Sequence, residues 1–472
     1  MQRMNRRSFL AASAAMSAAI TGAPTLGAPA LGAPVTPVAP AAKKSGPAPQ
    51  AAPRSGSVDV VIVGAGAAGI AAARRLAAAG RRFALLEATA TVGGRCITDT
   101  ALFGVPFDRG AHWVHMPDIN PVAKLGTQTG LDIYPAPPGQ RVRIGRRYAR
   151  DGEMESYLGG IVRATTAIAD ASRKNDLPCA QALPKDLGDW RSTIEFVLGP
   201  FGCGKDLSEI SALDFSRSAE RDSDVLCRQG FGALLAKLAA GVPVELSNPV
   251  TRISWGAHSG RVEVETARGT LEARAAIVTV STNVLTAGKI KFMPDLPKRQ
   301  LDAAARLKLG SYDHVALELP DNPLGLRPDE LVFEKSDSSR TAALFANVSG
   351  TPLCVVDVAG GFGRDLAAKG DAAMFDFATG WLAGLFGTDM GKAVKRKYAT
   401  HWNDEPWALG AFSCAAPGGQ PSRKVLMESV KDRIWFAGEA AHETLWGTVG
   451  GAWESGERAA DAAVKSLGRK PG

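Results

Sequence analysis

Cysteine and histidine are scarce in this sequence, and neither residue type is grouped. The 472 residues include six histidines and six cysteines. The cysteines are well separated along the chain: Cys96, Cys179, Cys203, Cys227, Cys354 and Cys414. Structural zinc sites need closely spaced Cys or His ligands, so we expect no metal centre. Free thiols are expected, and a disulfide stays open for a protein that leaves the cytoplasm.

Acidic residues are absent from residues 1–57, which hold six basic residues. The remaining chain has 49 basic and 47 acidic residues, so the formal charge of +8 comes mainly from this N-terminal segment. A charge that is confined to one tail argues against nucleic-acid binding. Beyond the N-terminal region, the sequence also lacks an apolar run that is long enough to span a bilayer.

The N-terminal segment resembles a twin-arginine export signal. Residues 5–10 read NRRSFL and precede an Ala-rich run. We expect a signal peptide over residues 1–30, cleaved after Ala30, and a disordered Ala/Pro-rich linker over residues 31–56. A disordered basic N-terminus is the alternative. Twin-arginine export moves folded proteins, so the expected location is periplasmic or secreted.

A glycine-rich turn follows the first predicted strand. Residues 58–63 are apolar and mostly β-branched, which is typical of a buried strand, and residues 67–79 favour a helix. The turn between them has the pattern G-x-G-x-x-G, formed by Gly64, Gly66 and Gly69. These glycines permit a tight turn, close approach of a diphosphate, and packing of the helix on the strand. The helix would present its free N–H groups to the phosphates at Ala67 and Ala68.

An acidic residue ends the second predicted strand, over residues 82–87. Glu87 follows Gly64 by 23 residues, where a carboxylate can accept hydrogen bonds from an adenosine ribose. The strand–helix–strand unit therefore predicts dinucleotide binding. A glycine-rich unit of the same topology without a ligand is the alternative.

A second glycine pair indicates which dinucleotide is bound. Residues 91–95 read TVGGR directly after the second strand, and a nicotinamide-binding unit has no need of them. This arrangement resembles the flavin-dependent amine oxidase family, which binds FAD. The resemblance implies that Gly94 passes close to the cofactor and that Arg95 steadies its diphosphate or flavin portion.

Residues 107–115, FDRGAHWVH, are similar to a segment of the polyamine oxidase branch of that family. There the segment lies on the face of the flavin, which implies cofactor contacts for Gly110, Ala111 and His112. The resemblance also places His112 in the substrate cavity, where a histidine can accept a proton or a hydrogen bond. A packed structural histidine is the alternative.

Two later segments resemble further cofactor contacts of the family. In the P-V-x-x-I run, Val250 would pair with the adenine edge. In a strand that ends in G-E, Gly438 and Glu439 would contact the ribityl–diphosphate portion. A helix that begins at Val449 would direct its N–H toward flavin O2, where negative charge builds on reduction.

Residues 402–413, WNDEPWALGAFS, resemble the family's last flavin-binding stretch, which begins with Trp402. Phe412 would form one wall of an aromatic cage over the flavin. Some members attach FAD through a cysteine just before that aromatic; here Ala411 implies non-covalent FAD. The second cage aromatic is replaced by Thr448, for which Trp446 could compensate.

Residues 309–317, LGSYDHVAL, resemble a strand whose lysine holds a water against flavin N5, and here that position is His314. A neutral imidazole can hold a water, but it supplies no fixed positive charge. Oxygen reduction by the flavin passes through superoxide, which a nearby cation stabilises. We therefore expect slow reaction with oxygen and faster reaction with another acceptor. The alternative is that His314 is a core residue.

Periodicity predicts further elements outside these motifs. We expect helices over residues 154–174 and 187–198. We also expect a hairpin strand over residues 270–275, followed by a separate buried strand over residues 276–280.

The resemblance covers roughly residues 57–465 and implies a two-domain α/β flavoprotein. We expect a Rossmann-like FAD-binding domain and a substrate domain of mixed sheet and helices. The former would comprise residues 57–140, 221–300 and 398–472, and the latter residues 141–220 and 301–397.

The implied function is oxidation of an amine, polyamine-like or another primary or secondary amine. Hydride would pass from the α-carbon to flavin N5, and the imine would hydrolyse. Oxygen or a periplasmic acceptor would then reoxidise the flavin. Two alternatives stay open: a flavin enzyme acting on amino acids, which would need an arginine for the carboxylate, and a flavin-binding protein without turnover.

Overall fold

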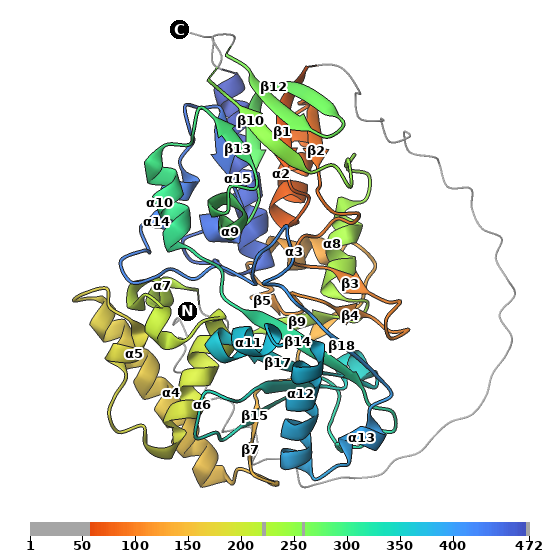
Figure 1. Ribbon diagram of the computed structural model, residues 1–472, viewed down its shortest axis with the longest axis vertical. Coiled ribbons are helices and arrows are strands. Elements are labelled where there is room, and N and C mark those ends of the chain that lie inside the picture. The colour runs from red at the N-terminus through yellow and green to blue at the C-terminus, as the bar shows by residue number, and fades with distance from the viewer. Residues whose placement is uncertain (1–56, 220–222, 257–259, 469–472) are drawn as a thin grey trace, which may run out of the picture.

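The computed structural model describes residues 57–219, 223–256 and 260–468. The predicted signal peptide and linker lie outside these residues. The described chain forms two parts, each built around a large sheet, which lie above one another in Figure 1. Within the described residues, no helix is both long enough and apolar enough to cross a membrane.

The sheet of the upper part combines strands from three separated stretches of the chain. Its order is β13 (Lys291–Met293), β10 (Val250–Ser254), β11 (Val262–Thr266), β12 (Gly269–Val278), β1 (Val58–Val63) and β2 (Phe83–Leu86), with β19 (Ile434–Phe436) also paired to β12. The pairs β1–β2, β1–β12 and β12–β19 are parallel. Parallel central strands are covered on both faces, which explains why β1 is apolar almost throughout.

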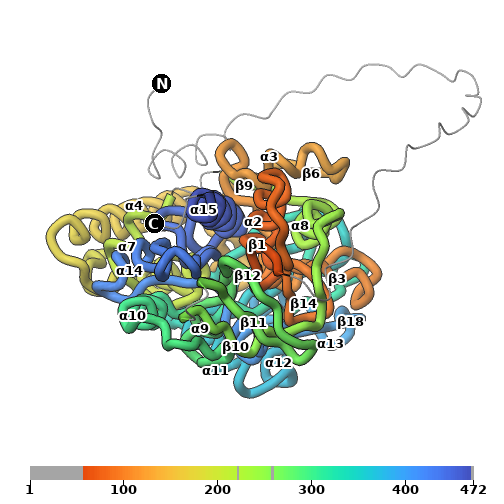
Figure 2. Tube along the Cα trace, turned by 90° about the horizontal axis from the view of Figure 1, so that it is seen from above, coloured from red at the N-terminus to blue at the C-terminus, as the bar shows by residue number. Residues whose placement is uncertain are grey.

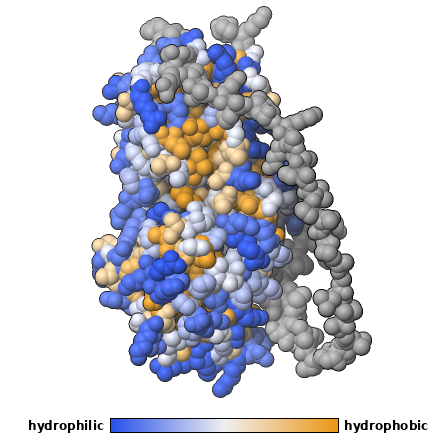
Figure 3. Space-filling model, turned by 90° about the vertical axis from the view of Figure 1, so that its right-hand side faces the viewer, coloured by the Kyte–Doolittle hydropathy of each residue, from blue (hydrophilic) through white to orange (hydrophobic). Residues whose placement is uncertain are grey.

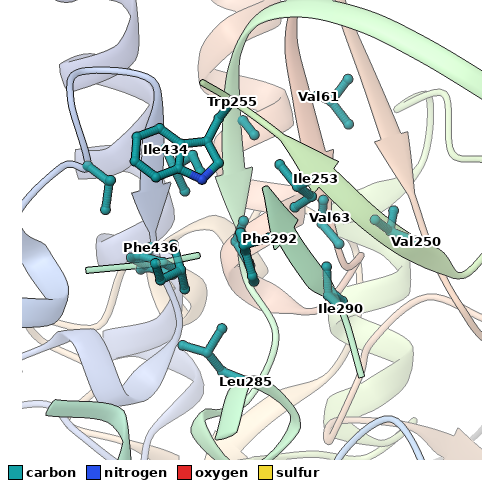
Figure 4. Close-up of a cluster of buried hydrophobic side chains, with 14 of the residues drawn as sticks. Val61, Val63, Val250, Ile253, Trp255, Leu285, Ile290, Phe292, Ile434 and Phe436 are labelled. Atoms are coloured by element: carbon teal, nitrogen blue, oxygen red, sulfur yellow. The ribbon is translucent and has the colours of Figure 1, made fainter. Parts of the chain in front are cut away.

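Alternate side chains of β1 enter two different cores. Val61 and Val63 point into a core that also holds Ile253, Phe292 and Phe436 (Figure 4). Helices α10 (Lys298–Arg306) and α14 (Ser422–Met427) contribute to the same core.

On the opposite face, Val60 and Ile62 pack with α2 (Ala67–Ala78) and α15 (Val449–Leu467). These two helices lie side by side in Figure 2.

The sheet of the lower part has the order β18 (Arg396–Ala399), β14 (Tyr312–Glu318), β17 (Leu353–Ala359), β16 (Ala343–Ala346), β15 (Glu330–Glu334), β7 (Arg141–Ile144) and β8 (Arg147–Tyr148). Helices α11 (Gly360–Ala367) and α12 (Asp371–Phe386) share a core with one face. Helices α4 (Asp151–Ser172), α6 (Arg191–Phe196) and α7 (Ala212–Arg217) share a core with the other.

Two predicted elements differ from the structure. The helix expected over residues 187–198 is divided into a 3₁₀ turn (Gly188–Trp190), α6, and a π-helical segment (Val197–Phe201). Pro200 lies inside the last segment and cannot donate a helical hydrogen bond, which favours the wider turn. The strands expected over residues 270–275 and 276–280 are one strand, β12.

The expected domain boundaries stay a prediction, and two elements bear on them. Helix α10 starts just before the expected boundary at residue 301, but its Ala303 and Ala304 belong to the upper core. Strand β18 continues to Ala399, past the expected boundary at residue 397.

The surface that faces right in Figure 1 is shown in Figure 3, where hydrophobic residues gather in its upper half.

Candidate active site

One large cavity is lined by residues of both parts of the molecule. Its volume is about 2220 Å³. Typical pockets for small ligands measure about 300–1,000 Å³. The cavity therefore has room for a dinucleotide-sized cofactor together with a substrate.

Nearly all of the residues predicted as site residues line this cavity. The cofactor-binding candidates on its wall are Gly64, Gly66, Ala67, Ala68, Glu87, Gly94, Arg95, Gly110, Ala111, His112, Val250, Trp402, Gly438, Glu439 and Val449. The other two reaction-site candidates, His314 and Phe412, line it as well. Gly69 does not, because it lies beneath the turn: a Cβ at this position would be 1.8 Å from the Gly64 carbonyl oxygen.

The nucleotide end of the cavity is built on the first strand and its helix. Gly64 adopts a left-handed φ of 102°, which permits the turn between β1 and α2. The N-terminal residues of α2 then lie on the cavity wall. Glu87 orders the same wall, because its carboxylate accepts hydrogen bonds from the Ala65 N–H at 2.6 Å and from the Thr89 N–H at 2.8 Å. A helix N-terminus and a buried carboxylate suit a diphosphate and a ribose, respectively.

A buried polar network links the two later motifs. Glu439 accepts hydrogen bonds from Ser413 Oγ at 2.6 Å and from the Gly447 N–H at 2.9 Å, and it pairs with Arg95 at 3.0 Å. Burial raises the pKa of the Glu439 carboxyl, but Arg95 and the hydrogen bonds outweigh burial, so the net pKa is lowered. Arg95 also donates to the Ala411 carbonyl oxygen. The network thus holds the Ala411–Ser413 segment, which includes Phe412, against the cavity.

The last helix directs its N-terminus toward the cavity. Gly447, Thr448 and Val449 all line the wall. Thr448 is the N-cap of α15, and its hydroxyl accepts a hydrogen bond from the Gly451 N–H. This capping role explains why a small hydroxyl residue is suited to this position. Trp446 does not replace the second cage aromatic: it is 1% exposed, belongs to the lower core, and lies beneath the Arg423 guanidinium.

The aromatic wall beside Phe412 is formed by Tyr312 instead. The centroids of these two rings are 6.0 Å apart, and the rings are inclined by 44°. Phe201, from the π-helical segment, lies 6.1 Å from Tyr312, and all three residues line the cavity. Tyr312 was not predicted from the sequence. One signal in the sequence could have identified it. Tyr312 lies two residues before His314 on the same strand, and this spacing places both side chains on one face.

His112 is buried in an aromatic setting at the same end. Its ring stacks on Phe345 with a centroid distance of 5.2 Å and an interplanar angle of 8°. The pKa of His112 is lowered to about 3. Burial is the largest cause of this shift, and the charge of His314 is the next. His112 is therefore neutral near pH 7. His112 lines the cavity, and its buried Nε2 atom has no hydrogen-bond partner among the described residues, so this atom is left to form a hydrogen bond with a ligand.

His314 differs from the expectation of an imidazole that holds a water. Its Nδ1 atom lies 2.6 Å from Asp357 Oδ1, and its Nε2 atom lies 2.9 Å from the Gly110 carbonyl oxygen. Both ring nitrogens therefore interact with protein acceptors. Burial lowers the pKa of His314, but Asp357 and the Gly110 carbonyl outweigh burial, and the net pKa is raised. Asp357, another residue that the sequence did not reveal, lies directly opposite His314 in the β14–β17 pairing.

Trp402 closes the wall next to Gly110. Its indole Nε1 donates to the Arg109 carbonyl oxygen at 2.8 Å. Its backbone N–H donates to the buried carboxyl of Asp313 at 2.8 Å. A Cβ at Gly110 would be 2.2 Å from the Arg95 carbonyl oxygen, so this position requires glycine.

These features fit FAD. The N-terminal residues of α2 and α15 and the residue Glu87 all line the cavity, where they can serve the phosphates, the flavin ring and the ribose of a dinucleotide. Ala411, rather than a cysteine, precedes Phe412. All six cysteines are buried, and none of them forms a disulfide. Among the described residues, no group of three or more His, Cys, Asp or Glu side chains is arranged to hold a metal ion.

Comparisons with known sequences place this site in a family. The sequence profile of the family described as flavin containing amine oxidoreductase matches residues 67–464. Lysine-specific histone demethylase 2 of Homo sapiens is 27% identical over 445 residues, which cover 85% of this chain. Polyamine oxidase 4 of Oryza sativa subsp. japonica is 27% identical over 440 residues, which cover 86% of this chain. The chain spans 53% of the demethylase, about half its length, and 89% of the polyamine oxidase.

Solved structures share the architecture. Cyclohexylamine oxidase from Brevibacterium oxydans matches with a TM-score of 0.73 and 21% identity, over 87% of this chain and 100% of that one. Putrescine oxidase bound to putrescine matches with a TM-score of 0.72 and 20% identity, over 87% of this chain and 99% of that one. At such identity the likeness concerns the fold, and it confirms the predicted two-domain α/β class.

Proposed function

Because this chain belongs to the family of flavin containing amine oxidoreductases, we propose that it oxidises an amine whose reacting nitrogen lies between His112, Tyr312 and Phe412. Membership confirms two predictions: the protein is an oxidoreductase that acts on amines, and its cofactor is a flavin. Ala411 at the position of covalent attachment supports non-covalent FAD. When bound, the flavin supplies the acceptor for a hydride from the carbon next to nitrogen. The resulting imine would then hydrolyse to an aldehyde and an amine.

The observation that carries this proposal is that neutral His112 lines the cavity and that its buried Nε2 atom has no hydrogen-bond partner in the described part of the chain. Most amines are protonated near pH 7, and hydride loss requires a nitrogen with a free lone pair. With a pKa of about 3, His112 is too weak a base to take that proton, but its neutral ring can form a hydrogen bond with the uncharged amine. The rings of Tyr312 and Phe412 provide π-faces that attract an amine cation on its way in.

The arginines of the cavity favour amines over amino acids. Each of them contacts another protein group: Arg95 pairs with Glu439, Arg109 donates to the Tyr398 hydroxyl, and Arg141 and Arg327 pair with Glu330. A substrate carboxylate would have to compete with these partners for its charge-assisted hydrogen bonds. Oxidation of amino acids is therefore the weaker alternative.

Carboxylates on the cavity wall support a substrate with more than one amine. Asp151 and Glu155 line the cavity, and both are solvent-exposed. They are four residues apart on α4, which places them on one face of the helix. We propose that a second ammonium group of a diamine or polyamine lies near them.

Anaerobic reduction of the bound flavin tests the proposal. Cadaverine and lysine form a matched pair, because they differ only by the carboxylate of the amino acid. Bleaching of the flavin by cadaverine, and far slower bleaching by lysine, is expected. Faster bleaching by lysine would favour the amino-acid alternative. A flavin that dithionite reduces but that no primary or secondary amine reduces would contradict the proposal.

We also propose export by the twin-arginine route, and reoxidation by oxygen or a periplasmic acceptor. The sequence NRRSFL at residues 5–10 supports export from the cytoplasm. Replacing Arg6 and Arg7 with lysines should retain the protein in the cytoplasm of a twin-arginine-competent host, as measured by fractionation. Unchanged export of that variant would contradict the proposed route.

A further inference from the structure

The position of His314 restricts where its protons can be. Gly110 presents a carbonyl oxygen to Nε2, and a carbonyl can only accept a hydrogen bond. The Nε2 atom of His314 must therefore carry a proton. The remaining question is whether the proton between Nδ1 and Asp357 Oδ1, which are 2.6 Å apart, belongs to the imidazole or to the carboxyl group.

The hydrogen bonds of Asp357 are compatible with a proton on the imidazole. Tyr312 donates its hydroxyl proton to Asp357 Oδ2 at 2.9 Å. An ionised carboxylate accepts at both oxygens, so it suits a donor at Oδ1 as well as one at Oδ2. Short contacts between nitrogen and a carboxylate are also typical of charge-assisted hydrogen bonds.

We propose that His314 is a buried imidazolium that donates to Asp357 and to Gly110, and that this cation is a positioning group that adds to burial in disfavouring protonation of His112. The two imidazole centroids are 5.3 Å apart. A second positive charge at that distance inside the protein is costly, so protonation of His112 is disfavoured. The role assigned to His112 rests on the proposed amine oxidation, whereas the protonation state of His314 does not.

The charged surroundings agree with this assignment. Carboxyl groups of Asp357, Asp313 and Asp108 act on His314 electrostatically. Burial raises the pKa of both Asp313 and Asp108, so Asp357 is the carboxyl best placed to be the counter-ion. The net pKa of His314 is raised, while that of His112 is lowered by burial and by His314. His115, which pairs with Asp224 at 2.7 Å, acts on His112 more weakly.

Nitrogen-15 NMR of histidine-labelled holoprotein, without substrate, tests the proposal. The chain has only six histidines, and single His→Gln variants assign their ring signals. At pH 7, His314 is expected to show two protonated nitrogens, and His112 one. In Asp357→Asn, His314 should lose one ring proton. The control Asp371→Asn removes the exposed partner of His401 and should leave the His314 signals unchanged.

A pair of substitutions tests the effect on His112. In His314→Gln the cation is lost, and the protonation midpoint of His112 should rise by on the order of one pH unit. In His314→Lys a cation is retained, and the midpoint should stay near the wild-type value.

Two results would overturn the proposal. A wild-type His314 with an unprotonated Nδ1 would place the proton on Asp357. An equal His112 midpoint in wild type and both His314 variants would show that burial alone keeps His112 neutral. Neither result depends on turnover, so both are distinguishable from failure of the proposed amine oxidation.

Discussion

The Arg423 guanidinium and the Asp214 carboxylate form a bidentate ion pair in which neither side chain is exposed to solvent. Its two contacts measure 2.6 and 2.7 Å. Arg423 lies on α14 in the upper part, and Asp214 lies on α7 in the lower part. Arg423 also donates to Ser413 Oγ, which in turn donates to Glu439. The pair therefore joins both parts of the molecule to the segment that carries Phe412.

Asp214→Asn should strongly destabilise the protein, because it leaves the Arg423 charge buried without a counter-ion. Removal of one partner of a buried ion pair typically costs about 3–5 kcal/mol. The shift of the urea unfolding midpoint measures this loss. Asp461→Asn, which breaks an exposed pair with Arg75, is the control and should leave the midpoint nearly unchanged. Equal midpoints for the two variants would contradict the predicted importance of burial.

His112→Gln should slow reduction of the flavin by amines by on the order of 100-fold, as expected when a group that positions the reacting amine is lost. The FAD content should not change, because the prediction concerns the substrate side of His112. Anaerobic stopped-flow reduction and the ratio of flavin to protein absorbance measure these quantities. The control His442→Gln alters a histidine that pairs with Glu454 outside the cavity wall. Parallel loss of FAD and activity in His112→Gln would indicate a structural role instead.

The local parts of the site could be predicted from sequence because their geometry is set within a few residues. The G-x-G-x-x-G turn requires a left-handed φ at Gly64 and leaves no room for a side chain at Gly69. A carboxylate at the end of the second strand, Glu87, follows from the same short unit. Such features depend on strand, turn and helix chemistry that neighbouring residues fix.

The long-range parts could not be predicted, because they depend on strand register. His314 and Asp357 are 43 residues apart and meet only because β14 and β17 pair in one register. Trp446 was expected near the cage because it is close to Thr448 in sequence. The chain reverses between them at Gly447, with a φ of 70°, and Trp446 enters the lower core beneath Arg423.

The carboxylates of Asp151 and Glu155 should matter for diamines more than for monoamines. The double variant Asp151→Asn/Glu155→Gln should weaken binding of cadaverine by about two- to fivefold, as expected for solvent-exposed charge pairs. Binding of cyclohexylamine should change little. Asp170→Asn, which neutralises a carboxylate on the same helix but outside the cavity wall, is the control. Equal weakening for both amines would argue against a second ammonium site on this face.

Reactivity with oxygen should depend on the charge of His314. If His314 is a cation, His314→Lys should not raise the rate at which oxygen reoxidises the amine-reduced flavin, and His314→Gln should lower it by about 10- to 100-fold. If His314 is neutral, as the sequence alone suggested, His314→Lys should raise that rate. Stopped-flow mixing of the reduced enzyme with oxygen separates the two cases. The same variants mixed with an artificial acceptor show whether a change is specific to oxygen.

Acidification should destabilise the protein through His112. Its pKa is about 3 in the folded state, against about 6.5 in an unfolded chain. The unfolded state therefore binds more protons between about pH 6.5 and pH 3. Stability falls as the pH falls through that range, by up to about 1.4 kcal/mol per pH unit. The difference between the free energy of unfolding of wild type and that of His112→Gln should therefore decrease as the pH falls through this window.

His314 should give the opposite sign, because its folded pKa is raised. Its contribution to stability is fully present below the unfolded pKa of about 6.5, and is lost as the pH rises through the folded value. The difference between wild type and His314→Gln should therefore shrink with rising pH. Urea unfolding of the holoprotein from pH 4 to pH 9 measures both differences. Two differences that change in the same direction would show that the two neighbouring imidazoles do not carry opposite pKa shifts.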